Sequence, residues 1–146
     1  MNSNNENSLI SQLLKRDVIS IIENKTIFDA IKLLTYNNIG ALPVINENIE
    51  LCGILSERDI IRAMSQNIGI NLKKTSINSI MTSKVITISN NTISEDIMDI
   101  MTKNKIRHIP IVENKLLIGI VSIGDVVKRL LEKFNLENQH LKSWLY

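Results

Sequence analysis

The chain has 146 residues, a hydrophobic fraction of 44% and a formal net charge of +2, with no basic run. This charge argues weakly against nucleic-acid binding, because phosphates call for clustered Lys and Arg. No stretch approaches the roughly 18 consecutive apolar residues that a membrane-spanning helix needs. Cys52 is the only cysteine, which excludes an internal disulfide and a thiolate metal cluster.

The chain opens on a polar stretch, residues 1–8, which we predict to be disordered. This stretch has neither the basic region nor the apolar region of a secretory leader, so we expect a cytoplasmic protein without membrane association. The helical spacing of the apolar residues that follow predicts a short helix covering the first of two repeated units. Those residues are Leu9, Ile10, Leu13 and Leu14.

The first unit follows in the order strand, helix, strand, strand, helix. Thr26 and Asp29 have capping-box spacing, and Ser56 stands where a second helix would begin. Helical periodicity and short apolar runs beside turn residues place the other boundaries. We predict a strand over 18–22, a helix from 26 to about 37, strands over 41–45 and 51–55 joined by a turn at 46–48, and a helix from 56 to about 66.

The second unit repeats this order. The segment GILSERDIIR, from Gly53, returns as GIVSIGDVVK from Gly119, 66 positions later, with four identical and four similar positions. We predict a strand over 85–88, a helix from about 94 to 104, strands over 109–112 and 117–121 around a turn at 113–115, and a helix from 123. The divisions are a repeat over 9–67, a connector over 68–76, a repeat over 77–134 and a C-terminal helical extension over 135–146.

Each unit would be marginally stable alone, because a chain of roughly 60 residues buries only about 60% of its surface. We therefore predict one pseudo-symmetric α/β (α+β) domain of two packed halves. The sequence supports no nucleophile with a base, no Gly-rich phosphate loop and no pair of catalytic carboxylates, so we expect no catalytic residue and no enzyme. The two histidines have no carboxylate at metal-binding spacing, so no metal site is expected.

Ser56 and Asp59, like Ser122 and Asp125, stand three positions apart at a predicted strand-to-helix junction. A Ser at the N-cap with an acid at N3 satisfies free helix amides by itself, so capping alone explains both pairs. The same geometry could bind an anion at the helix N-terminus, with the carboxylate accepting hydrogen bonds from a ribose. Both interpretations stay open from the residues alone.

Arg107 and His108 lie just ahead of Pro110. They are either solvated residues entering an edge strand or contacts for a phosphate. Strand alternation would point the two side chains to opposite faces, so we do not expect both to reach one phosphate.

The ordered set of these features, found twice, resembles the cystathionine β-synthase (CBS) domain, two of which form a Bateman module. The resemblance covers about residues 10 to 134, and the motifs that carry it are TIFDA from Thr26, IGALPV from Ile39, GILSERD from Gly53, IRHIPI from Ile106 and GIVSIGD from Gly119. It implies two tandem β-α-β-β-α repeats, packed pseudo-symmetrically.

In that family the Gly-hydrophobic-x-Ser/Thr-x-x-Asp segment binds adenosine ligands, with the hydroxyl near phosphate and the Asp on the ribose. The resemblance carries these roles to Ser56, Asp59, Ser122 and Asp125. Arg107 and His108 match positions where related modules direct basic side chains toward phosphates. The first copy has Gly40 and Ala41 at those positions, so its phosphate contact would come from elsewhere, with Arg58 as the candidate.

The resemblance implies a regulatory module that binds an adenosine nucleotide between its repeats and signals to a separate, unidentified effector protein. It implies no obligate cofactor. AMP, ADP and ATP are the expected ligands, and NAD(H) and S-adenosylmethionine stay open. The alternative is a ligand-free interaction scaffold in which the two Ser-Asp pairs only cap helices.

We also expect a homodimer, since related modules pair through their helices. The helices after Ser56 and Ser122 carry more apolar residues than one small sheet would cover: Ile60, Ile61, Met64, Val126, Val127, Leu130 and Leu131. A stripe through Phe134, Leu141 and Trp144 would add to that contact.

Overall fold

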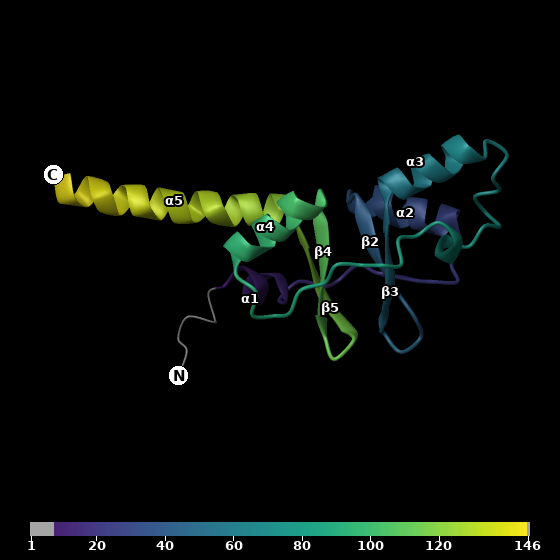
Figure 1. The fold of residues 1–146 in the computed structure, drawn as a ribbon, viewed down its shortest axis with the longest axis horizontal. Helices are drawn as coiled ribbons and strands as arrows, with labels where there is room; N and C mark the ends of the chain where they lie inside the picture. The colour runs from purple at the N-terminus through teal and green to yellow at the C-terminus, as the bar shows by residue number, and fades with distance from the viewer. Residues whose placement is uncertain (1–7, 146) are drawn as a thin grey trace.

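The structure is a computed structural model that describes residues 8–145. The predicted disorder of residues 1–8 therefore concerns, apart from Ser8, a part of the chain outside the described residues. Ser8 caps helix α1 (Leu9–Leu13), since its hydroxyl accepts a hydrogen bond from the Ser11 amide at 3.1 Å. Figure 1 shows the mixed α/β architecture, in which two β-hairpins stand side by side and each is accompanied by helices.

The first repeat contains the predicted order of elements. They are β1 (Ile21–Ile22), α2 (Ile27–Asn37), β2 (Ala41–Ile45), β3 (Leu51–Ser56) and α3 (Glu57–Gln66). β2 pairs with β1 in parallel and with β3 in antiparallel orientation. Only two residues of the strand predicted over 18–22 pair in this way, while the two helices and the hairpin are confirmed.

The second repeat consists of α4 (Ser94–Asn104), β4 (His108–Glu113), β5 (Leu116–Ser122) and α5 (Ile123–Leu145), preceded by a single 3₁₀ turn over Ile77–Ser79. β4 and β5 form an antiparallel hairpin. The helix predicted from 123 and the extension predicted from 135 are one continuous helix of 23 residues. No helix among residues 8–145 is both long and apolar enough to cross a membrane.

The strand predicted over 85–88 does not form. Only Ile88 pairs with β4, where its amide donates to Pro110 O at 3.1 Å and its carbonyl accepts from the Val112 amide at 3.0 Å. Upstream, Thr82 exchanges two backbone hydrogen bonds of 2.9 Å with Ile54 of β3. The segment between these two anchors therefore links the repeats.

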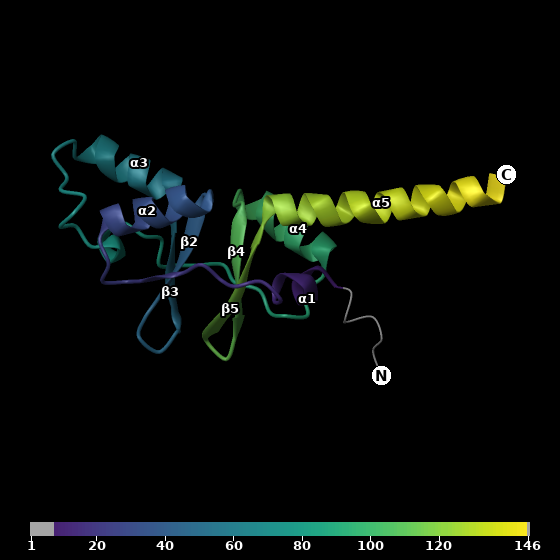
Figure 2. The same cartoon turned by 180° about the vertical axis from the view of Figure 1, so that it is seen from behind.

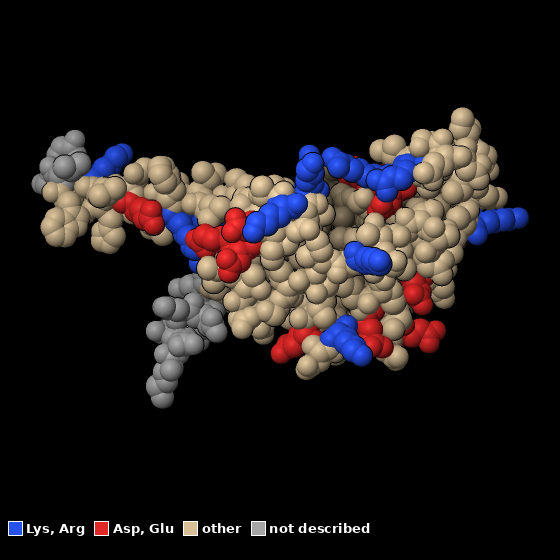
Figure 3. Space-filling view, viewed as in Figure 1, with Lys and Arg blue, Asp and Glu red and all other residues tan. Residues whose placement is uncertain are grey.

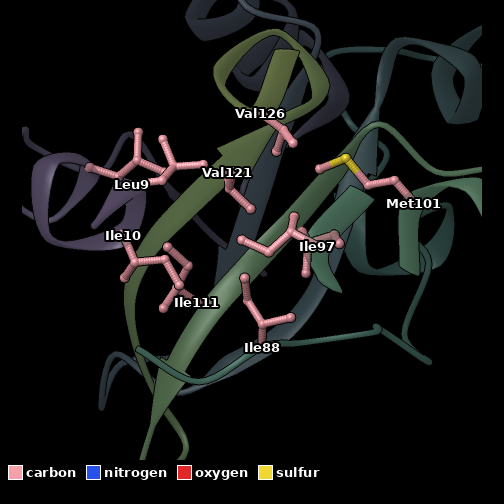
Figure 4. Packing of buried hydrophobic residues seen from close by; sticks show 10 residues of the cluster. Leu9, Ile10, Ile88, Ile97, Met101, Ile111, Val121 and Val126 are labelled. Carbon is pink, nitrogen blue, oxygen red and sulfur yellow. The ribbon is translucent and has the colours of Figure 1, made fainter. Parts of the chain in front are cut away.

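Helix α1 covers the second repeat, contrary to the prediction that it covers the first. Leu9 and Ile10 belong to the core of the second repeat and lie beside Val121 and Ile111 of its hairpin (Figure 4). The amphipathic pattern of α1 shows that one face is buried but carries no information on which surface receives it. The polypeptide after α1 must therefore cross from the second repeat to the first to reach β1 (Figure 1).

Candidate functional site

Both strand-to-helix junctions form complete capping boxes. The Ser56 amide and hydroxyl donate to Asp59 Oδ2 at 2.8 and 3.1 Å, and the Asp59 amide donates back to the Ser56 hydroxyl at 3.3 Å. Ser122 and Asp125 repeat this geometry with distances of 2.8, 2.9 and 3.2 Å. Capping is thus confirmed at both junctions. Because the cap uses Oδ2, it leaves Oδ1 of each carboxylate for other partners.

Two clefts lie between the repeats, and each combines elements of both. The Asp59 cleft, of about 310 Å³, has the junction at Ser56 and Asp59 on one side and the entry to β4 at Arg107 and His108 on the other. The Asp125 cleft, of about 380 Å³, has the junction at Ser122 and Asp125 opposite the entry to β2 around Asn38 and Gly40.

Each cleft therefore pairs the helix junction of one repeat with the strand entry of the other repeat. Arg107 of the second repeat therefore lies across from the junction at Ser56 in the first repeat. Arg58 and Arg107 line the same cleft. Sequence repetition shows which residues are equivalent but not which repeat supplies the opposite wall of a cleft.

The Asp59 cleft is the basic one. It is lined by Arg58, Lys105 and Arg107, together with the acidic residues Glu57 and Asp59. Figure 3 shows Lys and Arg side chains around a hollow between the two repeats. The equivalent positions of the other repeat are uncharged, namely Gly124, Asn38 and Gly40. The two copies have therefore diverged so that these cationic side chains collect in one cleft.

His108 borders both clefts, and Arg107 borders the Asp59 cleft with it. Strand alternation does not separate the two side chains here, because β4 begins at His108 and Arg107 precedes it. Burial lowers the pKa of His108, and the charge of Arg107 acts in the same direction, while Asp125 and Glu57 oppose the shift. The imidazole is therefore neutral near pH 7.

Arg16 binds the carboxylate of Asp125 in the other cleft. Its Nη2 donates to Asp125 Oδ2 at 2.8 Å and to Ile120 O at 3.3 Å, and its Nη1 donates to Asp125 Oδ1 at 3.3 Å. Burial alone would raise the pKa of Asp125, but the hydrogen bonds from Arg16 and from Ser122 outweigh it and hold the pKa below its usual value. Arg16 is not among the predicted site residues, because it belongs to no repeated motif.

Asp59 has a different environment. Its side chain is 7% exposed, and its Oδ1 lies 3.6 Å from Nη1 of Arg62, one turn along the same helix. Arg62 is mostly exposed, so this ion pair is weak. Within residues 8–145, no group of three or more His, Cys, Asp or Glu side chains is placed to hold a metal ion.

The family model described as "CBS domain" matches residues 10–66 and 77–132, which together contain both junctions and both strand entries. The chain belongs to the CBS domain family. The CBS pair of this chain is 40% identical over 124 residues to CBSX3, a mitochondrial CBS domain-containing protein of Arabidopsis thaliana, and the match covers 82% of this chain and 60% of the relative. YhcV of Bacillus subtilis is 31% identical, and the match covers 82% of this chain and 83% of that relative.

Solved structures of CBS proteins have the same fold. A protein with CBS domains from Burkholderia ambifaria is 34% identical, with a TM-score of 0.75 over 83% of this chain and 92% of the other. The CBS domain pair of protein MJ0100 is 31% identical, with a TM-score of 0.76 over 86% of this chain and 98% of the other. That pair was solved in complex with 5′-methylthioadenosine and S-adenosyl-L-methionine.

Proposed function

We propose that this CBS pair is a regulatory sensor that binds one adenosine nucleotide per chain in the Asp59 cleft. Asp59 accepts the ribose hydroxyls, the Ser56 hydroxyl lies near the phosphates, and Arg58, Lys105 and Arg107 neutralise the phosphate charge. The observation that carries the proposal is the collection of these three cations in one cleft. His108 lies beside them. Ser122 and Asp125 form a second candidate pair, which binds no nucleotide in the parent chain because Arg16 holds the Asp125 carboxylate.

The cations favour a phosphorylated ligand. The complex of MJ0100 supports adenosine recognition by a related CBS pair. Its ligands, however, carry no phosphate, and S-adenosylmethionine brings a sulfonium cation that Arg58, Lys105 and Arg107 would repel. AMP, ADP and ATP therefore fit the Asp59 cleft best, with NAD(H) next because its pyrophosphate carries negative charge.

The ligand signals through the contact between the repeats. Because each cleft is built from both repeats, a bound nucleotide stabilises one relative arrangement of the two hairpins over others. A separate effector protein reads that arrangement, which gives the chain a regulatory rather than a catalytic role. A ligand-free scaffold is the alternative, since the capping boxes explain both Ser-Asp pairs without a ligand.

Calorimetric titration separates these functions. Protein freed of carried-over ligand is titrated with ATP, AMP, NAD⁺ and S-adenosylmethionine. The proposal predicts one site per chain and affinity that increases with phosphate charge. Absence of binding by all four would favour the scaffold, and binding of S-adenosylmethionine alone would contradict the phosphate assignment.

The homodimer belongs to the same proposal. Ile61 and Met64 on α3, with Val127 and Leu131 on α5, are exposed apolar residues on the helices through which a second chain would pack. Ile60 and Val126, which the sequence suggested for this surface, are instead buried in the cores of their own repeats.

A further inference from the structure

The C-terminal part of α5 projects from the body of the molecule. Val126 is buried in the core of the second repeat, and Lys133 forms a salt bridge of 3.2 Å with Glu95 of α4. Beyond Lys133 the helix extends away from both hairpins (Figures 1 and 2). An isolated stretch of helix this short is marginal in water, so a projecting segment of this kind gains stability from a partner surface.

A heptad stripe runs along this helix. It consists of Val127, Leu131, Phe134, Asn138 and Leu141, separated by steps of 4, 3, 4 and 3 residues. The four apolar members are 42%, 57%, 58% and 63% exposed in chain order. The face that packs on the body contains Val126, Leu130 and Lys133, none of which belongs to the stripe. A 3.5-residue repeat of this kind suits a left-handed coiled coil, with Leu131 and Asn138 at positions a and the other three at positions d.

We infer that the stripes of two copies of this chain pair as a parallel two-stranded coiled coil. Asn138 is the one polar residue among the five, and a single Asn at an a position specifies register and a two-stranded state in such pairs. Glu137 and Lys142 then occupy positions g and e, and a parallel arrangement brings Glu137 of each chain beside Lys142 of the other. In an antiparallel pair g faces g and e faces e, so this charge complementarity is lost.

The coiled coil has only two heptads in the described helix, so it depends on the proposed homodimer for strength. Contact between the bodies of the two chains holds the helices together and raises their effective concentration. Nucleotide plays no part in this pairing. Failure of the coiled coil would therefore leave the proposed nucleotide site untouched, and failure of nucleotide binding would leave the coiled coil untouched.

Disulfide trapping tests the register. In a Cys52→Ala background without nucleotide, Asn138→Cys should oxidise readily to a covalent dimer, because equivalent a positions face each other only in a parallel, in-register pair. Leu136→Cys is the matched control, since Leu136 is 64% exposed but lies at position f, on the outside of the pair. Linkage of Cys at 138 but not at 136 supports the proposal. Absence of linkage at 138, or equal linkage at both positions, overturns it.

Sedimentation of uncrosslinked protein provides a second readout. Leu141→Lys should weaken dimerisation at least about tenfold, because two charges would meet at one d layer. Leu136→Lys should leave dimerisation unchanged. Glu137→Lys should weaken the dimer several-fold, and adding Lys142→Glu should restore it. A monomeric parent chain at micromolar concentration, or equal effects of the lysines at 136 and 141, would assign the stripe to a different partner and overturn the proposal.

Discussion

The guanidinium of Arg16 spans both carboxylate oxygens of Asp125, at 3.3 Å from Oδ1 and 2.8 Å from Oδ2. At Asp59, the equivalent residue, the ion pair is with Arg62 on the same helix at 3.6 Å. The two carboxylates have the same caps but are not equally available to a ligand. A ribose entering the Asp125 cleft must displace Arg16, whereas one entering the Asp59 cleft meets a carboxylate that is only 7% exposed and has a longer ion pair, of 3.6 Å, with Arg62.

Arg16→Ala should therefore open the second site. We expect calorimetric titration with ATP to give one site for the parent protein and two for the variant, with the added site weaker because its cleft has fewer cations. Arg62→Ala is the matched control and should retain a single site. One site in both variants would show that Arg16 does not restrict the Asp125 cleft.

Arg107→Ala should weaken ligands in proportion to their phosphate charge. A charge-assisted hydrogen bond is worth about 1.5–3 kcal/mol, which corresponds to a loss of roughly 10- to 150-fold for ATP. AMP should lose less, and adenosine should lose almost nothing. Equal losses for the three ligands would assign Arg107 a structural role.

Nucleotide binding should raise the pKa of His108. Burial lowers the pKa of His108 in the free folded protein below the value near 6.5 that it has in the unfolded chain. Above pH 6.5 the titration of His108 therefore costs no stability, and the folded protein loses stability as pH falls from 6.5 toward the folded pKa. A phosphate nearby favours the imidazolium, so nucleotide affinity should increase as pH falls through the same range. NMR titration of the imidazole signals measures this, with exposed His140 as the reference. A pKa of His108 that does not change on adding ATP would place the phosphates elsewhere.

Gly53→Ala should destabilise the fold more than Gly119→Ala, although the two glycines are equivalent in the repeat. A Cβ at position 53 would lie 2.7 Å from the backbone oxygen of Thr82. At position 119 it would lie 3.1 Å from the terminal methyl groups of Ile111 and Leu14, which can rotate away. We expect about 1–3 kcal/mol for Gly53→Ala and less for Gly119→Ala in urea unfolding. Equal losses would show that the contact between β3 and Thr82 adapts easily.

The parts of the fold that depend on local signals were predictable. The capping boxes at Thr26, Ser56 and Ser122 lie at helix starts, and the end of α2 follows from its periodicity. The prediction of a strand over 85–88 was wrong because a short apolar run forms a strand only where the edge of another strand is available to pair with it. Here the backbone is held at Thr82 by the first repeat and at Ile88 by the second.

The other wrong or missing predictions concern contacts between residues far apart in the sequence. Nothing in the amphipathic pattern of α1 indicates which repeat it covers, and nothing in the duplicated motifs indicates that Arg107 faces Ser56 across the pseudo-symmetric contact. Arg16 was missed for the same reason, since its partner Asp125 is 109 positions away. The residue types of the candidate site were visible in the sequence, but their distribution over two unequal clefts required the structure.

Comparison of Asp59→Ala with Asp29→Ala tests the central claim most directly. Asp29 forms the same capping box with Thr26, at 3.1, 2.9 and 3.2 Å, but lines neither cleft. Each variant loses the carboxylate half of one capping box, while the Thr26 or Ser56 hydroxyl still accepts from the backbone amide, and should lose about 1 kcal/mol of stability.

Titration of both variants with ATP then separates the roles of the two carboxylates. We predict that Asp59→Ala loses roughly 10- to 150-fold in affinity, since a charged hydrogen bond to ribose is worth about 1.5–3 kcal/mol, and that Asp29→Ala binds like the parent protein. Unchanged affinity in folded Asp59→Ala would contradict the proposed nucleotide site and leave Asp59 as a helix cap alone.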